Sequence, residues 1–544
     1  MTDDIDWKLG SLSDHTTGQG RYMYVEGDSR EDRGNIARLL SYPQSSSQSQ
    51  CLSFHHRMHG PDTGTLNIFS IYDGGEEKLI WTSSGTQGNR WHRDSVTLTG
   101  QNYQLIFEAM RDGSVGHIAI DDITITSGTC PTPTRCSFEA GTCGFSSEGT
   151  YTWKLHQHSP SESHNGPYFD HTLQTFTGFY MLIDTSSSSL PWKKTAILTS
   201  SSYSAQPDEA CLNFWYQLGG ADPGKLTVYI EEDTGKKKVK RELLSISENH
   251  QESWHHKSLA LQSERPWVLL FEAVGAGGDR SYIALDDIHI RHHRCHEAVS
   301  CDFEWGTCAW TNVRIPLMDT YDWDWTCGNA LARPNFAPEK DHSPGTLEGH
   351  YAFVDTGAMH AEGTSAWLIS EHLPATGGSC FSFWYRTDSQ DHSHLAELVL
   401  YITSSQGLQP VWVLRGFHSN DWQEQQLQFN STVEFQIVFE ASKGSRPQGS
   451  IVALDNVKYT PDLLCNSEPK HKEKQNSGTI WATVIIVIII LLFSLLVFFI
   501  YRKWKRNHGN GPSLPEQGDQ IDGLDNVSYE QFQNEDMAST SSGR

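Results

Sequence analysis

The chain has few basic residues for its size and lacks the short motifs that mark common catalytic sites. Its 41 lysines and arginines stand against 66 aspartates and glutamates, which gives a formal net charge of −25. Such a charge repels nucleic acid and excludes it as a partner, whereas it is compatible with binding of cations. We find no Gly-x-Ser-x-Gly elbow and no phosphate-binding loop. His296-Glu297 begins a zinc-protease pattern, but Ser300 occupies the place of the second histidine. The sequence therefore predicts a protein that is not an enzyme.

Cysteine is absent after residue 465, and residues 480–501 carry no charge. A helix of about 20 apolar residues spans a bilayer, so we predict a transmembrane helix at 479–501. All 11 cysteines precede it, which places the N-terminal side in an oxidising extracellular or luminal compartment. Residues 466–478 are then a juxtamembrane stalk and 502–544 a disordered cytosolic tail, in the plasma membrane or an endosome. The start of the chain lacks a signal peptide, and we expect that it is N-terminally incomplete.

A set of motifs recurs three times before the predicted membrane helix. Each set begins with a cysteine at the start of an aromatic-containing block. Phe-Glu-Ala follows 56 to 60 residues later, and then come Asp-Asp or Asp-Asn and a final cysteine. A period near 160 residues fits whole domains in tandem. We call these repeat 1 (1–130), repeat 2 (136–295) and repeat 3 (301–465). The recurring segments are Cys51-Leu52-Ser53-Phe54, Cys211-Leu212-Asn213-Phe214 and Cys380-Phe381-Ser382-Phe383, with Asp121-Asp122, Asp286-Asp287 and Asp455-Asn456.

The repeats resemble the MAM domain, an extracellular module of meprins, neuropilins and mu-type receptor tyrosine phosphatases. The opening Cys136-Ser137-Phe138-Glu139 and Cys301-Asp302-Phe303-Glu304 also match, whereas repeat 1 lacks this first segment. The resemblance implies an all-β protein of tandem jelly-roll β-sandwiches that act in adhesion or protein recognition. Alternating apolar residues such as Leu212, Phe214 and Tyr216 agree with half-buried strands.

Comparison of the three repeats predicts which cysteines pair. Repeat 1 contains only Cys51 and Cys130, so these two form a disulfide with each other. The cysteines at the matching positions of repeats 2 and 3 should pair in the same way. The predicted disulfides are Cys51–Cys130, Cys136–Cys143, Cys211–Cys295, Cys301–Cys308 and Cys380–Cys465. Cys327 is left over, and two interpretations stand side by side: a buried thiol, or an intermolecular bridge in a homodimer.

Carboxylates recur in register and suggest a calcium site in repeats 2 and 3, since calcium prefers oxygen ligands. The candidates are Glu139, Asp184 and Asp286, with Glu304, Asp355 and Asp455. The alternative is that these side chains only accept backbone hydrogen bonds. A functional zinc site is not expected, because adjacent histidines on a strand point to opposite faces. Matching tryptophans are expected in the core: Trp7, Trp153 and Trp325 at one position, and Trp91, Trp254 and Trp422 at another.

Two short motifs point to modification and trafficking. Asn430-Ser431-Thr432 is a glycosylation sequon before the predicted membrane helix. In the tail, Tyr529 and Phe532 match a tyrosine sorting motif of the kind that clathrin-adaptor-type proteins bind, and the alternative is that this stretch is a plain disordered linker.

These features predict a single-pass membrane glycoprotein that binds an extracellular protein or a like molecule on a neighbouring cell. The alternative is a fragment of a meprin-like membrane protease whose catalytic domain lies upstream.

Overall fold

The computed structural model describes residues 5–465, apart from short gaps, together with 498–500 and 502–503. Residues Met1–Glu468 form one compact unit and Pro469–Arg544 another, and each is described by itself. The gaps are residues 12–13, 27–33, 61, 73–74, 114–115, 159–164, 236, 250–252, 314–320, 331–336, 360–363, 390–395, 416–420 and 444–449.

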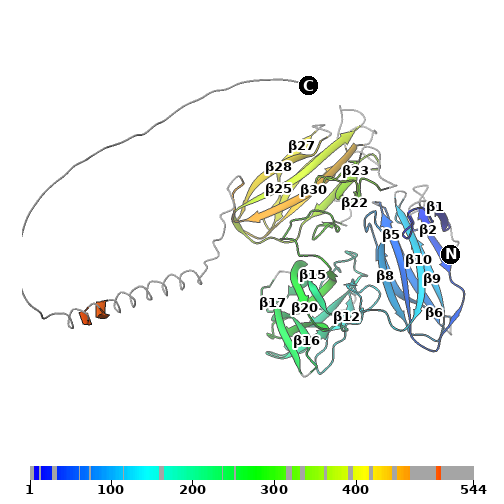
Figure 1. Cartoon of the computed structure of the whole chain (residues 1–544), viewed down its shortest axis with the longest axis horizontal. Helices are drawn as coiled ribbons and strands as arrows, with labels where there is room; N and C mark the ends of the chain where they lie inside the picture. Colours follow the sequence, from blue (N-terminus) through cyan, green and yellow to red (C-terminus); the bar gives the residue numbers. More distant parts are fainter. Residues whose placement is uncertain are drawn as a thin grey trace, which may run out of the picture. The chain divides into compact units, whose positions relative to one another are not determined.

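The strands of the first unit fall into three groups that match the three repeats (Figure 1). Repeat 1 contains one sheet of order β1-β2-β10-β5-β8 and a second of order β3-β9-β6-β7, with β4 beside β9. Every pairing is antiparallel. The strands are β1 (Lys8–Ser11), β2 (Arg21–Glu26), β3 (Ile36–Leu40), β4 (Gln44–Ser45), β5 (Gln50–His59), β6 (Thr65–Tyr72), β7 (Glu77–Ser84), β8 (His92–Leu98), β9 (Asn102–Met110) and β10 (His117–Ser127).

Repeat 2 has the same topology. Its first sheet runs β12-β13-β20-β15-β18, with β11 beside β20, and its second sheet runs β14-β19-β16-β17. The strands are β11 (Arg135–Cys136), β12 (Lys154–Gln157), β13 (Phe179–Asp184), β14 (Thr195–Thr199), β15 (Gln206–Gly219), β16 (Lys225–Asp233), β17 (Lys238–Ile246), β18 (His255–Ser263), β19 (Trp267–Val274) and β20 (Tyr282–Arg291).

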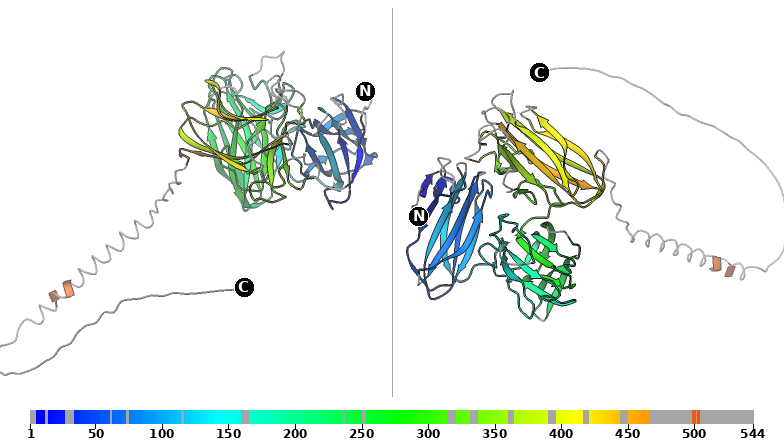
Figure 2. Two further views of the ribbon diagram at one scale, coloured as in Figure 1. Left: turned by 90° about the horizontal axis from the view of Figure 1, so that it is seen from above. Right: turned by 180° about the vertical axis from the view of Figure 1, so that it is seen from behind.

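Repeat 3 has the same arrangement a third time, and its strands form a group of their own in a further view (Figure 2, right). Its sheets run β22-β23-β30-β25-β28 and β21-β24-β29-β26-β27. The strands are β21 (Thr311–Asn312), β22 (Asp324–Cys327), β23 (His350–Asp355), β24 (Ser365–Ile369), β25 (Thr376–Ser389), β26 (Glu397–Ser404), β27 (Gly407–Arg415), β28 (Gln423–Ser431), β29 (Phe435–Ser442) and β30 (Ser450–Pro461). The all-β fold predicted from the sequence is confirmed.

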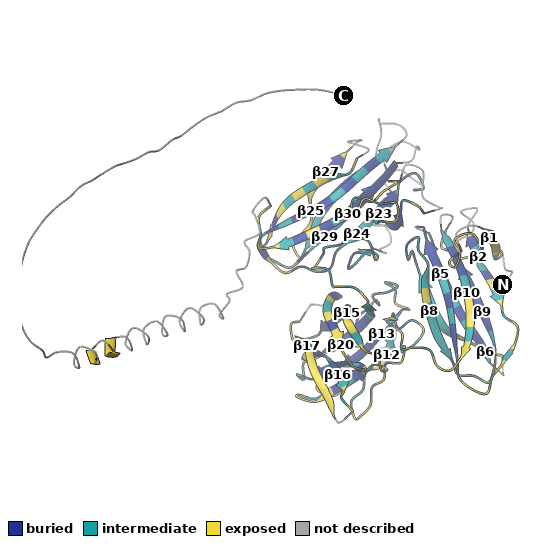
Figure 3. Cartoon of the chain, viewed as in Figure 1, coloured by how far each residue is buried: buried dark blue, intermediate teal, exposed yellow. Residues whose placement is uncertain are grey.

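Each core lies between the two sheets of its repeat. In repeat 2, Phe214 of β15 meets Phe271 of β19 edge to face, with ring centroids 5.3 Å apart. Phe54 and Phe107 take these places in repeat 1. Phe383 and Phe439 do so in repeat 3. Buried residues follow the inward faces of the strands, whereas β17 at a sheet edge is largely exposed (Figure 3). The alternation of apolar and polar residues along the strands thus gives each sheet one apolar face, and the two apolar faces pack together in a sandwich.

The predicted tryptophan position is wrong for repeat 3. Trp7 and Trp153 stand just before their first strands and donate their indole N–H groups to Ala37 and Ala196. In repeat 3 the residue that does the same is Trp323, which donates to the carbonyl of Ala366. The sequence comparison chose Trp325 because Trp323 and Trp325 each follow an aspartate, so the sequence pattern alone does not separate them.

Five disulfides close the repeats, and they are the five expected pairs. The long bridges are Cys51–Cys130, Cys211–Cys295 and Cys380–Cys465, which join residues 79, 84 and 85 positions apart. Cys136–Cys143 and Cys301–Cys308 each close a loop of separation 7. Each long bridge ties β5, β15 or β25, the strand next to one edge strand of the first sheet, to the end of its repeat and restricts the unfolded chain.

Within the part of the second unit that the structure describes, no helix is long and apolar enough to cross a membrane. Residues 498–500 and 502–503 are helical. The predicted membrane helix at 479–501 otherwise lies outside the described residues. So do the tail motif residues Tyr529 and Phe532.

Candidate functional site

A bulge in the last strand of each repeat positions the most unusual carboxylates. In repeat 2 the register between β15 and β20 shifts just past the pair Trp215↔Asp286. The next residue, Asp287, has a φ of 44°, in the left-handed region that side-chain-bearing residues seldom adopt. Asp122 and Asn456 have φ values of 48° and 45° at the matching positions. The bulge turns two consecutive side chains toward the same loop.

That loop begins at Asp170, and the buried Asp286 anchors it. The carboxylate of Asp286 accepts the backbone N–H of His171 at 2.8 Å and that of Asp287 at 2.8 Å. Asp287 accepts a hydrogen bond from His171 Nδ1 at 2.6 Å. Burial and the neighbouring Asp287 charge raise the pKa of Asp286 well above its usual range. Burial alone would raise the pKa of Asp287, but the hydrogen bond and charge of His171 together with Arg135 and the Thr172 hydroxyl outweigh burial and lower that pKa.

Asp170 folds the loop back on itself. Its side chain is buried and accepts the backbone N–H groups of Leu173 and, at 2.9 Å, Thr175. Gly178 allows this packing, because a Cβ there would lie 2.0 Å from Cγ of Asp170. Trp254 holds the other side of the loop by donating its indole N–H to the carbonyl of Phe169 at 2.9 Å.

Glu139 adds a third carboxylate from the small Cys136–Cys143 loop. Its Oε1 accepts the backbone N–H of Phe179 at 2.9 Å. Burial raises the pKa of Glu139 to about 8, and the charges of Asp170 and Asp287 add to the rise. Asp170 has a raised pKa as well, again chiefly through burial. Carboxylates that repel one another in a partly buried place are stabilised by protons or by a cation.

Repeat 3 has the same construction. Asp455 accepts the backbone N–H groups of His342 at 2.7 Å and Asn456 at 2.7 Å. Asp341 accepts the N–H of Thr346 at 2.8 Å, and Glu304 accepts that of His350 at 3.0 Å. Burial raises the pKa of Asp455 to about 8 and that of Glu304 to about 7.

Repeat 1 keeps only part of this arrangement. Asp121 accepts the backbone N–H of His15 at 2.9 Å, and Asp14 accepts that of Thr17 at 2.9 Å. No glutamate corresponds to Glu139, because the opening segment is missing from the sequence. Gly20 allows the Asp14 side chain to pack in repeat 1, because a Cβ at Gly20 would lie 2.7 Å from Cγ of Asp14.

Two of the predicted calcium ligands lie elsewhere. Asp184 is opposite Tyr282 in the sheet, four residues from Asp286 along β20, which is about 13 Å. It accepts hydrogen bonds from the Ser186 N–H at 2.8 Å and the Ser189 hydroxyl at 3.0 Å. Asp355 is likewise opposite Ile451, four residues before Asp455, and accepts the Gly357 N–H. Both aspartates end their strands and hold the following turns.

The carboxylates that hold this part of repeat 2 by accepting backbone hydrogen bonds are therefore Glu139, Asp170 and Asp286, and Asp170 was not among the predicted residues. A sequence signal for the missed residue exists. An Asp-His pair occurs in every repeat, at residues 14–15, 170–171 and 341–342. The pKa values of all three carboxylates are raised, chiefly by burial.

Two further predicted sites, the glycosylation sequon and the unpaired cysteine, lie within the described residues. Asn430 is exposed on β28, so its side chain is accessible to solvent. Cys327 is the one free cysteine among the described residues, and it is buried. Its Sγ lies 3.0 Å from Oδ1 of Asn329, and burial raises its pKa. This placement agrees with the buried-thiol interpretation.

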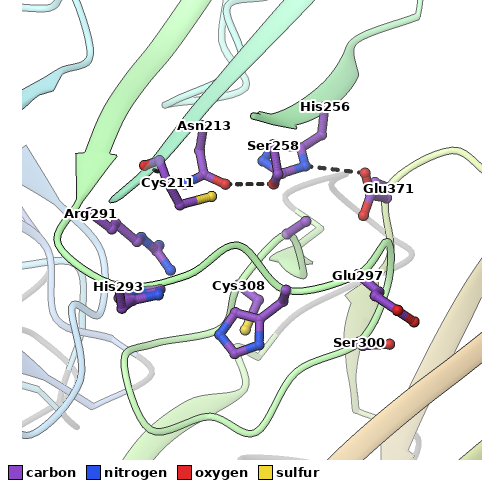
Figure 4. Close-up of a pocket in the computed structure, with 12 residues that line it drawn as sticks. Cys211, Asn213, His256, Ser258, Arg291, His293, Glu297, Ser300, Cys308 and Glu371 are labelled. Atoms are coloured by element: carbon purple, nitrogen blue, oxygen red, sulfur yellow. Dashed lines mark hydrogen bonds and ion pairs between the residues drawn. The ribbon is translucent and has the colours of Figure 1, made fainter. Parts of the chain in front are cut away.

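A small pocket lies where residues of repeats 2 and 3 meet (Figure 4). His256 Nδ1 is 3.1 Å from Glu371 Oε2, and Ser258 donates to Asn213 at 2.7 Å. The space is ≈ 20 Å³, enough for about one water molecule and too small for an organic ligand. The pocket is thus a polar packing contact.

Comparisons with known proteins agree with the repeats. The family model "MAM domain, meprin/A5/mu" matches residues 2–131, 136–296 and 301–466. MAM domain-containing protein 2 of Mus musculus is 26% identical over 477 residues, which cover 82% of this chain and 66% of that protein. Neuropilin-1 of Xenopus laevis is 40% identical over 146 residues, covering 25% of this chain and 16% of that protein. Zonadhesin of Homo sapiens is 26% identical over 500 residues, covering 84% of this chain and 17% of that protein.

The chain spans no more than about two thirds of the length of these relatives. Among solved structures, the CBM22-1-CBM22-2 tandem domain of Paenibacillus barcinonensis Xyn10C aligns with a TM-score of 0.23 at 9% identity, covering 54% of this chain and 92% of that one. With three family matches over most of its length, and one sandwich topology repeated in each, the chain belongs to the MAM domain (meprin/A5/mu) family.

Proposed function

We propose that this protein is a non-enzymatic single-pass membrane glycoprotein whose MAM domains bind an extracellular protein or a like molecule on a neighbouring cell. The N-terminal side faces the extracellular space or the lumen, Asn430 carries a glycan, and the tail motif at Tyr529 and Phe532 binds a clathrin-adaptor-type protein. The family membership and the five disulfides support the extracellular setting.

One observation supports recognition above all: an exposed aromatic cluster on the loop of repeat 2. Tyr168, Phe169 and Phe176 are 59%, 46% and 48% exposed. The rings of Phe169 and Phe176 are 4.5 Å apart, and His158 lies 5.2 Å from Tyr168. Aromatic side chains grouped on a surface are typical anchors of protein interfaces, because each buries a large area at small entropic cost.

The carboxylate cluster controls this surface in our proposal. Asp170 lies directly after Phe169, and its hydrogen bonds fix the turn that brings Phe176 back to Phe169. We assign calcium to Glu139, Asp170 and Asp286 in repeat 2, and to Glu304, Asp341 and Asp455 in repeat 3. The ion would offset the repulsion among these carboxylates, and the loop would present its aromatic residues in a fixed arrangement before a partner binds.

A mixed-cell adhesion assay tests the function. Non-adherent cells that express the full chain are dyed one colour, cells without it another, and the two are mixed in calcium. Clusters of expressing cells alone indicate a like molecule as partner, and mixed clusters indicate a different protein. The double variant Tyr168→Ser/Phe176→Ser should lose most of the clustering.

Tyr42→Ser is the matched control, because Tyr42 is 88% exposed but lies in repeat 1, away from the aromatic cluster. It should cluster like the parent chain. Surface labelling checks that all variants reach the membrane in equal amounts. Equal clustering by the double variant and the control, or no clustering by the parent chain with either cell type, contradicts the proposal.

A further inference from the structure

Repeat 1 differs from its two neighbours in the residue that faces the bulge. The first aspartate of each bulge pairs across the sheet with Trp215 in repeat 2, Trp384 in repeat 3 and His55 in repeat 1. In repeats 2 and 3 the tryptophan stacks on the loop histidine, with centroids 3.8 Å and 3.6 Å apart. In repeat 1 the imidazole of His55 stacks on that of His15 at 3.5 Å. The exchange puts a second imidazole where the sister repeats have an indole.

The two imidazoles and one carboxylate converge in repeat 1. His15 Nδ1 lies 2.8 Å from Asp122 Oδ2, and His55 Nδ1 lies 3.8 Å from the same oxygen. All three ligand atoms lie within 4.8 Å of one another. Ligands of a tetrahedral zinc ion at about 2.0–2.1 Å are themselves about 3.3 Å apart. The observed distances bracket that value, so small side-chain movements bring the three atoms to bonding distance of one ion.

The sister repeats lack this donor set. An indole offers one N–H donor and no lone pair for a metal, so repeat 2 has one imidazole beside Asp287. In repeat 3 the bulge residue is Asn456, whose amide lies 2.8 Å from His342 Nδ1. Only repeat 1, among these three matching places, combines two imidazoles with a carboxylate.

We propose that repeat 1 binds a divalent late transition metal of the zinc class through His15 Nδ1, His55 Nδ1 and the Asp122 carboxylate. Imidazole nitrogen with one carboxylate suits zinc, whereas the all-oxygen clusters of repeats 2 and 3 suit calcium. The side chains of His15, His55 and Asp122 are 36%, 16% and 35% exposed, so the ion enters from solvent and a water completes its coordination.

Binding changes the stacking of the two rings. The lone pair of Nδ1 lies in the ring plane, and the two planes are now inclined by only 13°. One ion can take both lone pairs only when the rings tilt apart. The ion then clamps three segments together: the loop that carries His15, strand β5 with His55, and strand β10 with Asp122.

The test counts zinc bound by the full chain purified in detergent. The protein is stripped with a chelator, equilibrated with Zn²⁺ and measured by atomic emission, and the Co²⁺ form is recorded by visible absorption. His55→Trp copies the residue of the sister repeats, and His15→Phe keeps a ring for stacking. Each should bind about one equivalent less than the parent chain and lose a tetrahedral Co²⁺ band.

His171→Phe, the matched change in repeat 2, should leave both readouts unchanged. Another group, His255, His372 and Glu434, remains in every variant, so any zinc that it holds cancels in the difference. Peptide mapping of the Cys51–Cys130 bridge checks that repeat 1 is folded. Folded variants at His15 and His55 that bind as much zinc as the parent chain, or a loss of the same size in His171→Phe, overturn the proposal.

Discussion

The raised pKa of Glu139 leads to a prediction about pH and stability in the absence of calcium. The folded-state pKa is about 8, above the ordinary value of 4.5. The folded protein therefore holds this proton more tightly than the unfolded chain, and the stability that the proton gives is complete only below the unfolded pKa. It is lost as the pH rises through the folded pKa. Repeat 2 in a chelator should become less stable between pH 5 and pH 8.

The size of the effect follows from linkage. Between pH 5 and pH 7 a group that is protonated in the folded protein and ionised in the unfolded chain lowers the free energy of unfolding by about 2.7 kcal/mol. Glu139 is partly exposed, so solvent screening reduces this to about 1–2 kcal/mol. For a domain of this size, that loss lowers the melting temperature by roughly 2–8 °C. In the proposed calcium site the ion replaces the proton, so the stabilising effect of added calcium should be larger at pH 8 than at pH 5.

Thermal unfolding of the full chain, followed in chelator and in calcium, measures both effects. Glu139→Gln keeps an oxygen for the Phe179 N–H but carries no charge, so it should remove the part of the pH dependence that Glu139 causes and reduce the calcium gain of repeat 2. Asp455 and Glu304 still titrate in repeat 3 of the variant, so a smaller pH dependence remains. Glu148→Gln is the matched control, because Glu148 is exposed in the same repeat. A melting temperature that stays level or rises from pH 5 to pH 8 in chelator refutes the reasoning. So does a fall of the same size in Glu139→Gln.

Three further predictions concern the disulfides, the free thiol and the tail. Cys211→Ser/Cys295→Ser opens a bridge of separation 84 and should cost repeat 2 about 4–5 kcal/mol in the free energy of unfolding, seen as early protease cleavage; unchanged protease resistance would contradict this. Because Cys327 is buried, the protein should run as a monomer on non-reducing gels, with Cys327→Ser identical to the parent chain; a dimer that this change abolishes would favour the intermolecular bridge. Tyr529→Ala should slow uptake of surface-labelled protein by removing one of the two adaptor contacts; unchanged uptake would return this segment to a plain linker.

The fold could be predicted because its determinants are short-range and occur three times. Alternation in Leu212, Phe214 and Tyr216 identifies a strand with one buried face, and all three residues are buried. The five cysteine pairs could be found by comparing a complete repeat with one that lacks its first segment. The strand prediction uses residues within one strand, and the cysteine pairing uses the presence or absence of a whole motif. Neither prediction needs the register between distant segments.

The candidate site could be predicted only in part, because it depends on register and on a bulge. Asp184 and Asp286 recur in step along the sequence, yet antiparallel pairing places them four residues apart on neighbouring strands. Asp170 lies in a loop without a periodic pattern, and its role follows from Gly178 and the hydrogen bonds of the turn. The convergence of His15 and His55 was missed for a related reason: the prediction considered adjacent histidines, whereas these two come from different segments.

One backbone device therefore supports three different donor sets. The bulge always turns two consecutive side chains toward the loop, and the left-handed residue is Asp122, Asp287 or Asn456. The residues around the bulge differ: an imidazole replaces an indole in repeat 1, and a partly buried glutamate lies beside the loop in repeats 2 and 3. Because the hydrogen bonds that hold the loop come from the backbone N–H groups, these side chains can change while the loop keeps its path. In our two proposals, a single sandwich scaffold thus carries sites for different ions along one chain.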